Sequence, residues 1–307
     1  MTQGRKKPIV PPALKRGDVI GVVAPAGPFD RSKLQAGINI LKSMGFKPFV
    51  PEGIFQKQDY LAGSDAHRAD IVNRLFENDS VKAIICARGG FGSIRILSMI
   101  NRESVRSNPK IFIGFSDITA LHAFLYKRCG LVSFHGPMAA TIADNCEKTR
   151  GALFEAVASG KKLRVRPDNG RTIYPGTAKG PVFGGNMATL CHLIGTDFFP
   201  DLSGHILVLE DTDEPLYKID RMMTQMEFAG VLSNVAGVVL GSFTNCGDTK
   251  KVDMLFEHLF KGRDIPVLSG FPIGHGKSNI TIPLGIKATI DTDNHLFLFH
   301  EPSTCDI

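Results

Sequence analysis

Residues 110–125 read KIFIGFSDITALHAFL, which is the clearest structural signal in the chain. The apolar run 110–114 predicts a buried strand, and the next three residues, Phe115-Ser116-Asp117, predict a turn. Apolar residues then recur at helical spacing as far as Leu125. The segment therefore predicts a strand, a turn and a helix in succession, with Ser116 in the turn.

The residues on the N-terminal side of this segment repeat the same alternation. Short β-rich runs occupy 18–24, 47–50 and 82–87, and a helix that Ser64 or Asp65 could cap is expected between the second run and the third. Strands that alternate with helices predict an α/β fold with a largely parallel sheet covered on both faces.

Functional groups in such sheets gather beyond the carboxyl ends of the strands. Gly89-Gly90 follows one predicted strand, and Ser116 follows the next. We therefore expect the glycine loop and Ser116 to be neighbours in space.

The length of 307 residues suggests two domains. We assign residues 1–140 to an N-terminal domain that carries Ser116. Residues 141–180, where the pattern weakens into polar and turn residues, are assigned to a connection. Residues 181–307 form a C-terminal domain, with strands expected at 206–210 and 237–240.

The charge distribution gives no support to nucleic-acid binding. The net charge is +6, but five of the 36 basic residues lie in the first sixteen residues, which contain no acids. Without those five, 31 basic and 30 acidic residues remain, so the rest of the chain is nearly neutral. We therefore interpret the basic excess as a solvated N-terminal arm. Four Tyr and no Trp also argue against a surface that stacks on bases.

The sequence also predicts a cytoplasmic protein without a membrane partner. No apolar run approaches the roughly 18 residues of a membrane-spanning helix, and the proline-broken start does not fit a secretory signal. The six cysteines are scattered without zinc-site spacing and are too sparse for a disulfide framework, so reduced thiols are expected.

Ser116 is a candidate nucleophile, because a strand-to-helix turn lifts a side-chain oxygen clear of the backbone. The amide of Asp117 and an amide of Gly89 or Gly90 could stabilise an oxyanion there. The nucleophile-elbow pattern expects glycine two residues after the serine, where this chain has Ile118. The alternative role of Ser116 is a helix cap.

A serine nucleophile needs a base, and a histidine base needs an orienting acceptor. The candidate bases are His135 and His275, and His275 has glycine on both sides, which fits a tight loop entering a cleft; an ordinary loop histidine is the alternative. Glu210 ends an apolar strand, where a buried carboxylate would need a partner. The alternative for Glu210 is an exposed acidic turn shared with Asp211, Asp213 and Glu214.

No metal and no cofactor are expected. The acidic residues at 210–214 lack a histidine at ligand spacing and do not form a calcium-loop pattern. The glycine loops at 21–28 and 89–92 contain neither a P-loop lysine motif nor G-x-G-x-x-G.

Several segments, in order from about residue 12 to about residue 300, resemble the LD-carboxypeptidase family. They are Tyr60-Leu61-Ala62-Gly63, Arg88-Gly89-Gly90-Phe91-Gly92, residues 113–121, His135-Gly136-Pro137-Met138, Gly184-Gly185-Asn186, Leu207-Val208-Leu209-Glu210-Asp211, Gly241-Ser242-Phe243 and Gly274-His275.

The resemblance implies a Rossmann-like N-terminal domain, a smaller β-rich α/β C-terminal domain and an active site between them. It implies a serine peptidase with Ser116 as nucleophile, His275 as general base and then acid, and Glu210 as the acceptor that orients the imidazole. It also implies an oxyanion hole of backbone amides, which we place at Asp117 and Gly90. Family members are commonly dimers, so a homodimer is expected.

The family has two branches with different substrates. Murein-recycling members release the terminal D-alanine of cytoplasmic tetrapeptides at the L-diaminopimelyl bond, whereas microcin-immunity members cleave a peptidyl nucleotide and use a tryptophan to recognise its base. Because this chain has no Trp, the resemblance favours a murein peptide. Arg88, beside the glycine loop, is the candidate for binding the free terminal carboxylate, and a structural ion pair is its alternative role.

Two hypotheses from other classes stay open. A two-domain α/β chain with an interdomain cleft could be a non-catalytic protein that binds a peptide. A glutamine-amidotransferase-like enzyme would use a cysteine nucleophile, but Ser116 occupies the turn.

Overall fold

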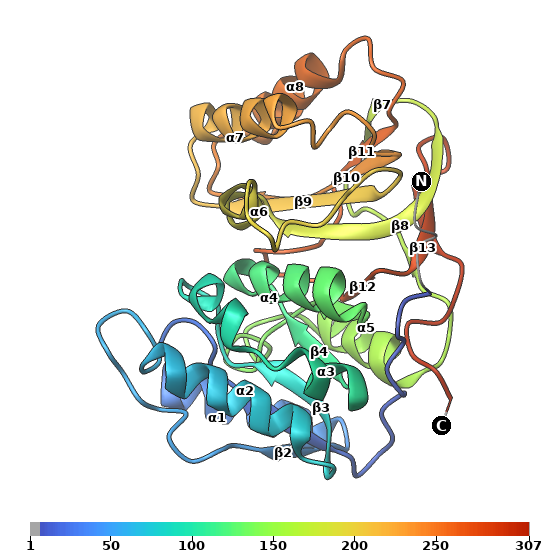
Figure 1. Cartoon of the computed structure of the whole chain (residues 1–307). Coiled ribbons are helices and arrows are strands. Elements are labelled where there is room, and N and C mark those ends of the chain that lie inside the picture. The colour runs from blue at the N-terminus through green and yellow to red at the C-terminus, as the bar shows by residue number, and fades with distance from the viewer. Residues whose placement is uncertain (1–6, 307) are drawn as a thin grey trace.

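The computed structural model describes residues 7–306. Its strands form two sheets, one of six strands and one of eight, which lie in separate layers of the molecule (Figure 1). The first sheet takes five of its strands from the N-terminal half, and the second is built from the C-terminal half. The expected α/β class with a two-domain layout is confirmed.

The six-stranded sheet has the order β12-β5-β4-β3-β1-β2. Its strands are β1 (Val19–Val23), β2 (Lys47–Phe49), β3 (Val81–Cys86), β4 (Ile111–Gly114), β5 (Ser133–His135) and β12 (Ile282–Leu284). Every neighbouring pair is parallel except β12 and β5. The largely parallel sheet predicted for this half is confirmed.

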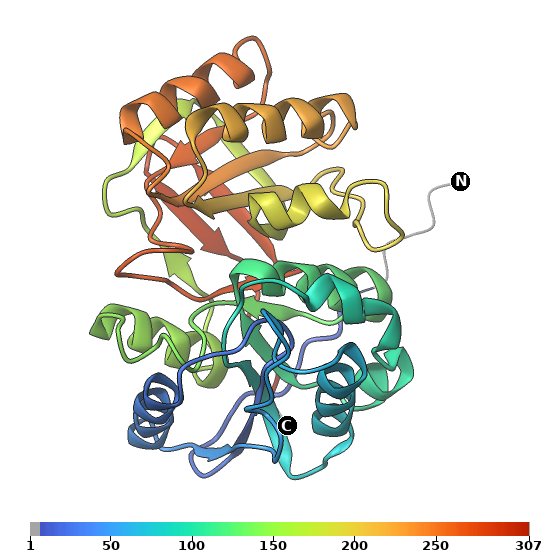
Figure 2. The ribbon, with the colours of Figure 1, turned by 90° about the vertical axis from the view of Figure 1, so that its left-hand side faces the viewer.

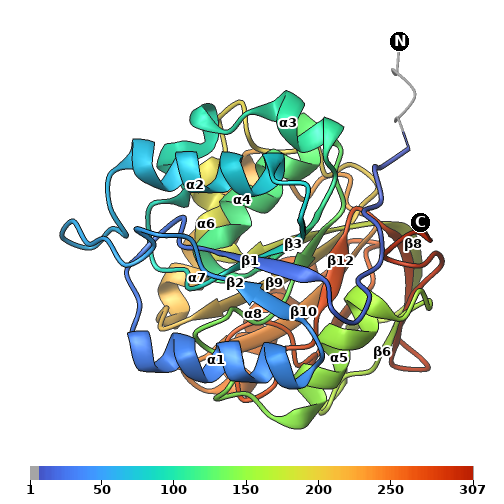
Figure 3. The same cartoon turned by 90° about the horizontal axis from the view of Figure 1, so that it is seen from below.

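Helices cover both faces of this sheet, which explains why all four residues of β4 are buried. Figure 3 shows α1 and α5 on one face and α2, α3 and α4 on the other. The helices are α1 (Arg31–Ser43), α2 (Asp65–Glu77), α3 (Arg102–Ser107), α4 (Thr119–Phe124) and α5 (Glu147–Ala158), with shorter turns η1 (Ser93–Met99), η2 (Ser116–Ile118) and η3 (Leu125–Cys129). The side chain of Ser64 accepts a hydrogen bond of 3.2 Å from the His67 amide, so the predicted cap of α2 is confirmed.

The eight-stranded sheet has the order β6-β14-β13-β8-β9-β10-β11-β7. Its strands are β6 (Arg164–Val165), β7 (Arg171–Tyr174), β8 (Thr177–Asn186), β9 (Ile206–Thr212), β10 (Gly237–Thr244), β11 (Val267–Ser269), β13 (Lys287–Asp291) and β14 (Leu296–Phe299). The four strands from β8 to β11 are parallel, and the flanking strands are antiparallel. The strands expected at 206–210 and 237–240 lie within β9 and β10.

Three helices accompany this second sheet: α6 (Met187–Leu193), α7 (Leu216–Phe228) and α8 (Thr249–Phe260). In Figure 2, α7 and α8, drawn in gold and orange, lie on the side of the sheet that faces away from the six-stranded sheet.

Residues 141–180 differ from the connection that we expected. They contain α5, β6 and β7, and β8 begins at Thr177. β6 and β7 are the two edge strands of the eight-stranded sheet, and their residues alternate between buried and exposed or are only half-buried. Their hydrophobic pattern is weak because these two strands bury little surface at the sheet edges. For that reason the polar and turn residues of this segment did not indicate strands. The domain limits at 140 and 181 stay a prediction.

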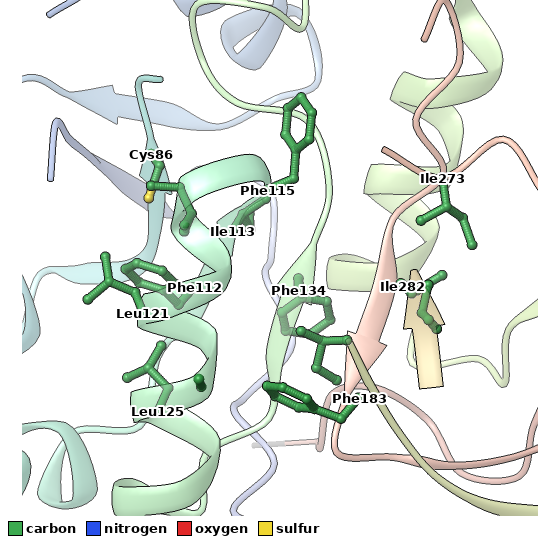
Figure 4. Packing of buried hydrophobic residues seen from close by; sticks show 14 of the residues in the cluster. Cys86, Phe112, Ile113, Phe115, Leu121, Leu125, Phe134, Phe183, Ile273 and Ile282 are labelled. Atoms are coloured by element: carbon green, nitrogen blue, oxygen red, sulfur yellow. The ribbon is translucent and has the colours of Figure 1, made fainter. Parts of the chain in front are cut away.

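The two halves are joined by a crossing of the chain and by a shared core. After β11 the chain passes to the six-stranded sheet, where Ile282 of β12 pairs with His135 of β5. Phe134 of β5 and Phe183 of β8 belong to the same buried cluster, which Figure 4 shows from close by. The connection 270–281, which carries His275, is therefore anchored in both sheets.

All six cysteines are free thiols, as expected, and four of them are buried. Within residues 7–306, no helix has the length and apolar character that a membrane crossing requires.

Candidate active site

Ser116 is the first residue of η2, in the tight turn that follows β4. Its φ is 65°, in the left-handed region that non-glycine residues rarely adopt. Such a conformation costs on the order of 1–3 kcal/mol and persists only where the surroundings enforce it. A Cβ on Gly114 would lie 2.8 Å from Cγ2 of Ile118, so glycine is needed there for the turn to fold back on the strand. The predicted strand, turn and helix are confirmed. The glycine of this turn, Gly114, lies two positions before the serine, whereas the nucleophile-elbow pattern expects it two positions after.

The glycine loop that follows β3 packs directly against this turn. A Cβ on Gly89 would lie 3.0 Å from the Cβ of Ser116 and 3.3 Å from the amide nitrogen of Asp117. The Gly89 carbonyl accepts a hydrogen bond of 3.0 Å from the amide of Gly27. Because the carbonyl and the amide of one trans peptide point in opposite directions, the amide of Gly90 points away from Gly27. The loop and the turn are neighbours, as expected.

Glu210 and His275 form a pair in the C-terminal half. Glu210 lies on β9 with 0% exposure, and its Oε2 is 2.7 Å from Nδ1 of His275. The same oxygen accepts a hydrogen bond of 3.1 Å from the backbone amide of His275. A Cβ on Gly274, whose φ is 99°, would lie 2.2 Å from Oε2, so glycine is required for the loop to approach the carboxylate. Glu210 is therefore a buried carboxylate with a partner and does not belong to an exposed turn.

The surroundings of His275 favour its charged form. Burial by itself lowers the pKa of the imidazole, but the hydrogen bond and negative charge of Glu210 raise it, with smaller contributions from the charges of Asp211 and Asp213. The net effect is a pKa above the usual 6.5. An imidazole in this position accepts a proton readily.

Phe115 brings the two halves of the site together. This residue directly precedes Ser116, and the centre of its ring is 4.8 Å from that of the His275 imidazole. The structure thus places the imidazole of His275, paired with Glu210, against the residue that directly precedes Ser116. No pattern in the sequence predicted the contact made by Phe115.

His135, the other candidate base, lies behind Phe115. Its ring centre is 5.9 Å from that of Phe115, and the residue is completely buried. Burial holds the pKa of His135 well below 6.5, so the ring is neutral. Within residues 7–306 neither of its ring nitrogens has a hydrogen-bond partner, so no carboxylate orients it as Glu210 orients His275.

Arg88 is exposed at the start of the glycine loop. Its Nη1 donates a hydrogen bond of 2.8 Å to the carbonyl of Pro28. The guanidinium is therefore held between the loop after β1 and the loop after β3.

The next acidic residues after Glu210 have local partners: hydrogen bonds for Asp211 and Asp213, and an ion pair with Lys218 for Glu214. Asp211 is buried and accepts from the side chain of Asn186 at 2.8 Å and from the amide of Ala188 at 2.9 Å. Burial raises the pKa of Asp211 to about 6. Across the part of the chain that the structure describes, no three His, Cys, Asp or Glu side chains are grouped as metal ligands would be.

Comparisons with known proteins identify two matching family models. The model described as the LD-carboxypeptidase N-terminal domain matches residues 20–136. The model described as the LD-carboxypeptidase C-terminal domain matches residues 179–290. The first range contains Ser116, and the second contains Glu210 and His275.

Individual proteins are similar to this chain over nearly its whole length. The probable murein peptide carboxypeptidase of Bacillus subtilis is 37% identical over 293 residues, which cover 92% of this chain and 91% of that protein. The microcin C7 self-immunity protein MccF of Escherichia coli is 30% identical and covers 94% of each chain. The crystal structure of muramoyltetrapeptide carboxypeptidase from Oxalobacter formigenes superposes with a TM-score of 0.81 at 30% identity, covering 92% of this chain and 97% of the other.

Proposed function

Since the chain belongs to the LD-carboxypeptidase family, we propose that it is a serine carboxypeptidase that releases the terminal D-alanine from murein tetrapeptides in the cytoplasm. The observation that carries the proposal is the buried Glu210–His275 pair next to the strained turn of Ser116. A nucleophile, a base and an orienting carboxylate are the three groups that acyl transfer by a serine requires.

In the proposed reaction, Nδ1–H of His275 donates to Glu210, which leaves Nε2 as the proton acceptor. Nε2 takes the proton of Ser116 while Oγ attacks the carbonyl carbon of the diaminopimelyl residue. The amides of Asp117 and Gly90 donate to the oxyanion that forms, and one such donor typically contributes about 2.7–4 kcal/mol. The strained backbone of Ser116 presents Oγ to the substrate.

Collapse of the tetrahedral intermediate breaks the carbon–nitrogen bond. The nitrogen of D-alanine takes the proton from His275, and the tripeptide stays attached to Ser116 as an ester. A water molecule then attacks the ester and gives its proton to His275. When the carbon–oxygen bond breaks, that proton returns to Oγ and the tripeptide is released with a new carboxylate.

Arg88 is proposed to bind the terminal carboxylate of the substrate. Its contact with the Pro28 carbonyl uses one of the five N–H donors of a guanidinium, which leaves donors for a bidentate pair with a carboxylate. The position beside the glycine loop places this charge next to the proposed oxyanion hole.

A peptidyl nucleotide is the second candidate substrate. The 30% identity to microcin C7 self-immunity protein MccF over 94% of the chain favours it. The absence of Trp from the sequence weighs against it, because the immunity branch was expected to use a tryptophan for the base.

Three substrates distinguish these proposals. The purified protein is given L-alanyl-γ-D-glutamyl-meso-diaminopimelyl-D-alanine, the same peptide with a C-terminal amide, and a peptidyl nucleotide. D-Alanine release from the free acid alone supports the murein assignment. In Arg88→Ala, kcat/KM for the free acid should then fall towards the value for the amide. Cleavage of the nucleotide alone would replace the murein substrate. Tight peptide binding without any cleavage would favour a binding protein.

A further inference from the structure

Arg68 is a buried cation that the proposed reaction does not use. It lies on α2, where Ile71, Val72 and Leu75 follow it at helical spacing on the buried face. Its exposed fraction is 0%. A guanidinium in such a place requires hydrogen-bond acceptors for its N–H groups.

Two of the acceptors of Arg68 belong to the two loops that lead into the site, and the third is on its own helix. Nη1 donates to the carbonyl of Pro25, in the loop after β1, and to the carbonyl of Gly92 at 2.8 Å. Nη2 donates to Asp65 on the same helix. One side chain therefore joins the loop after β1 to the glycine loop after β3.

The residue after the glycine loop, Ser93, begins η1 and is hydrogen-bonded to the nucleophile turn. Its amide donates to the carboxylate of Asp117 at 2.9 Å, and its hydroxyl donates to the carbonyl of Asp117 at 2.5 Å. Asp117 is itself buried. Burial raises the pKa of its carboxyl, and the hydrogen bonds from Ser93 and the charge of Arg68 oppose that rise.

The glycine loop is thus held on both sides of Gly90. The anchoring hydrogen bonds run from Gly27 to Gly89, from Arg68 to Gly92 and from Ser93 to Asp117. Gly90 has φ of 105° and carries no side chain of its own that could fix it. The position of its amide relative to Ser116 therefore depends on these anchors.

We infer that Arg68 is a positioning residue for the oxyanion hole, which acts through Gly92 and Ser93 to hold the Gly90 amide where the oxyanion forms. The inference rests on the proposed function. Arg68 is buried beneath the loop, so its effect is on the chemical step and not on the binding of substrate.

The test is Arg68→Lys, which keeps the positive charge but has a single nitrogen on a flexible chain. It cannot hold the carbonyls of Pro25 and Gly92 and the carboxylate of Asp65 together in the fixed geometry of the guanidinium. We expect kcat for D-alanine release to fall about 10- to 100-fold with KM within about twofold, because a misplaced donor costs less than a missing one. The affinity for a peptidyl boronic acid, which becomes tetrahedral on Ser116, should fall by the same factor as kcat/KM, while the affinity for the tripeptide product stays unchanged. Arg74→Lys is the matched control, since Arg74 lies on the same helix in an exposed ion pair with Asp70.

Ser93→Ala is the second variant, and it decides the question if Arg68→Lys does not fold. It removes only the hydroxyl bond to Asp117 and should lower kcat and boronate affinity together. In the double variant the total loss of transition-state stabilisation should be smaller than the sum of the losses in the two single variants, because both residues act on one loop. Unchanged kcat in either folded variant would overturn the inference. So would a rise in KM with weaker product binding but unchanged boronate affinity. Wild-type protein that releases no D-alanine would overturn the proposed function as well, and this is seen before any variant is made.

Discussion

One oxygen of the Glu210 carboxylate, Oε2, accepts hydrogen bonds from both the imidazole Nδ1 and the backbone amide of His275. Glu210→Gln keeps the size of the side chain but removes the charge, and an amide nitrogen can then face Nδ1. We expect kcat/KM for D-alanine release to fall on the order of 10³- to 10⁴-fold, because the imidazole loses its orientation and the partner of its cation. Asp220→Asn, at an exposed acid on α7, should leave kcat/KM unchanged. A loss smaller than tenfold in Glu210→Gln would contradict the orienting role.

The raised pKa of His275 determines the pH dependence that we expect. The base must be neutral to accept the proton of Ser116, so kcat/KM should rise with pH and reach half of its plateau above the usual 6.5. Removing the charge of Glu210 lowers the pKa of His275, so in Glu210→Gln the midpoint should move to lower pH while the plateau falls. The measurement is kcat/KM against pH for both proteins. A wild-type profile that stays flat as the pH rises through 6.5 and above it would argue against a histidine base.

The residues of the site differ in how far the sequence could predict them. Ser116, Glu210 and His275 stand out because they interrupt apolar or glycine-rich stretches. The structure pairs Glu210 with His275 and packs the His275 ring on the residue before Ser116. Arg68 could have been found, since helical spacing with Ile71 and Leu75 places it on the buried face of α2. The contact between Phe115 and His275 joins positions 160 residues apart, and no local pattern carries that information.

The glycine loop packs so closely on Ser116 that Gly89 has no room for a side chain. In Gly89→Ala the added methyl group would lie 3.0 Å from Cβ and 3.1 Å from Oγ of Ser116. We expect kcat to fall about tenfold, because Ser116 would have to move by a few tenths of an ångström and misplacement of a reacting atom by a full ångström can cost about 100-fold. The steady-state rate of D-alanine release measures it.

Gly151→Ala is the control for this substitution. Gly151 lies in the middle of α5, and a Cβ there would have nothing within 4 Å. Alanine should leave kcat unchanged and raise the free energy of unfolding by about 0.5–1 kcal/mol, because it costs less backbone entropy in a helix. Equal activity in the two variants would contradict the close packing of Gly89 on Ser116.

Strands that carry a continuous apolar run were predictable, whereas the two edge strands of the eight-stranded sheet were not, although β2, at an edge of the six-stranded sheet, was expected at 47–50. β1, β3 and β4 are short buried strands, each followed by a turn, and their positions match the expected runs. β6 and β7 were missed because edge strands are half-exposed. β12 joins the six-stranded sheet by pairing with β5, and a pairing between such distant segments depends on tertiary packing.

The shared core predicts that the two halves unfold as one unit. Phe183 of β8 is completely buried and stacks on Tyr126 with ring centres 4.9 Å apart. Phe183→Ala should lower the free energy of unfolding by about 3–5 kcal/mol. Because the core runs between the sheets, we expect a single transition in wild type and variant, measured by denaturant titration with probes in each half.

Phe228→Ala is the matched control, since that ring is 87% exposed at the end of α7. Its effect should stay within about 0.5 kcal/mol. Two separate transitions in the wild-type protein would show that the halves fold independently and would contradict the account of a shared core.

The proposed site draws on both halves of the molecule, with Ser116 directly after β4 and its neighbour Phe115 packed on His275 of the Glu210–His275 pair. The central claim is that this assembly makes Ser116 the nucleophile of a peptidase, and D-alanine release from L-alanyl-γ-D-glutamyl-meso-diaminopimelyl-D-alanine by wild type and Ser116→Ala tests it most directly. We predict release by the wild type and a loss of at least about 10⁴-fold in Ser116→Ala, with the thermal midpoint showing that the variant is folded. Release by Ser116→Ala at the wild-type rate would contradict the claim.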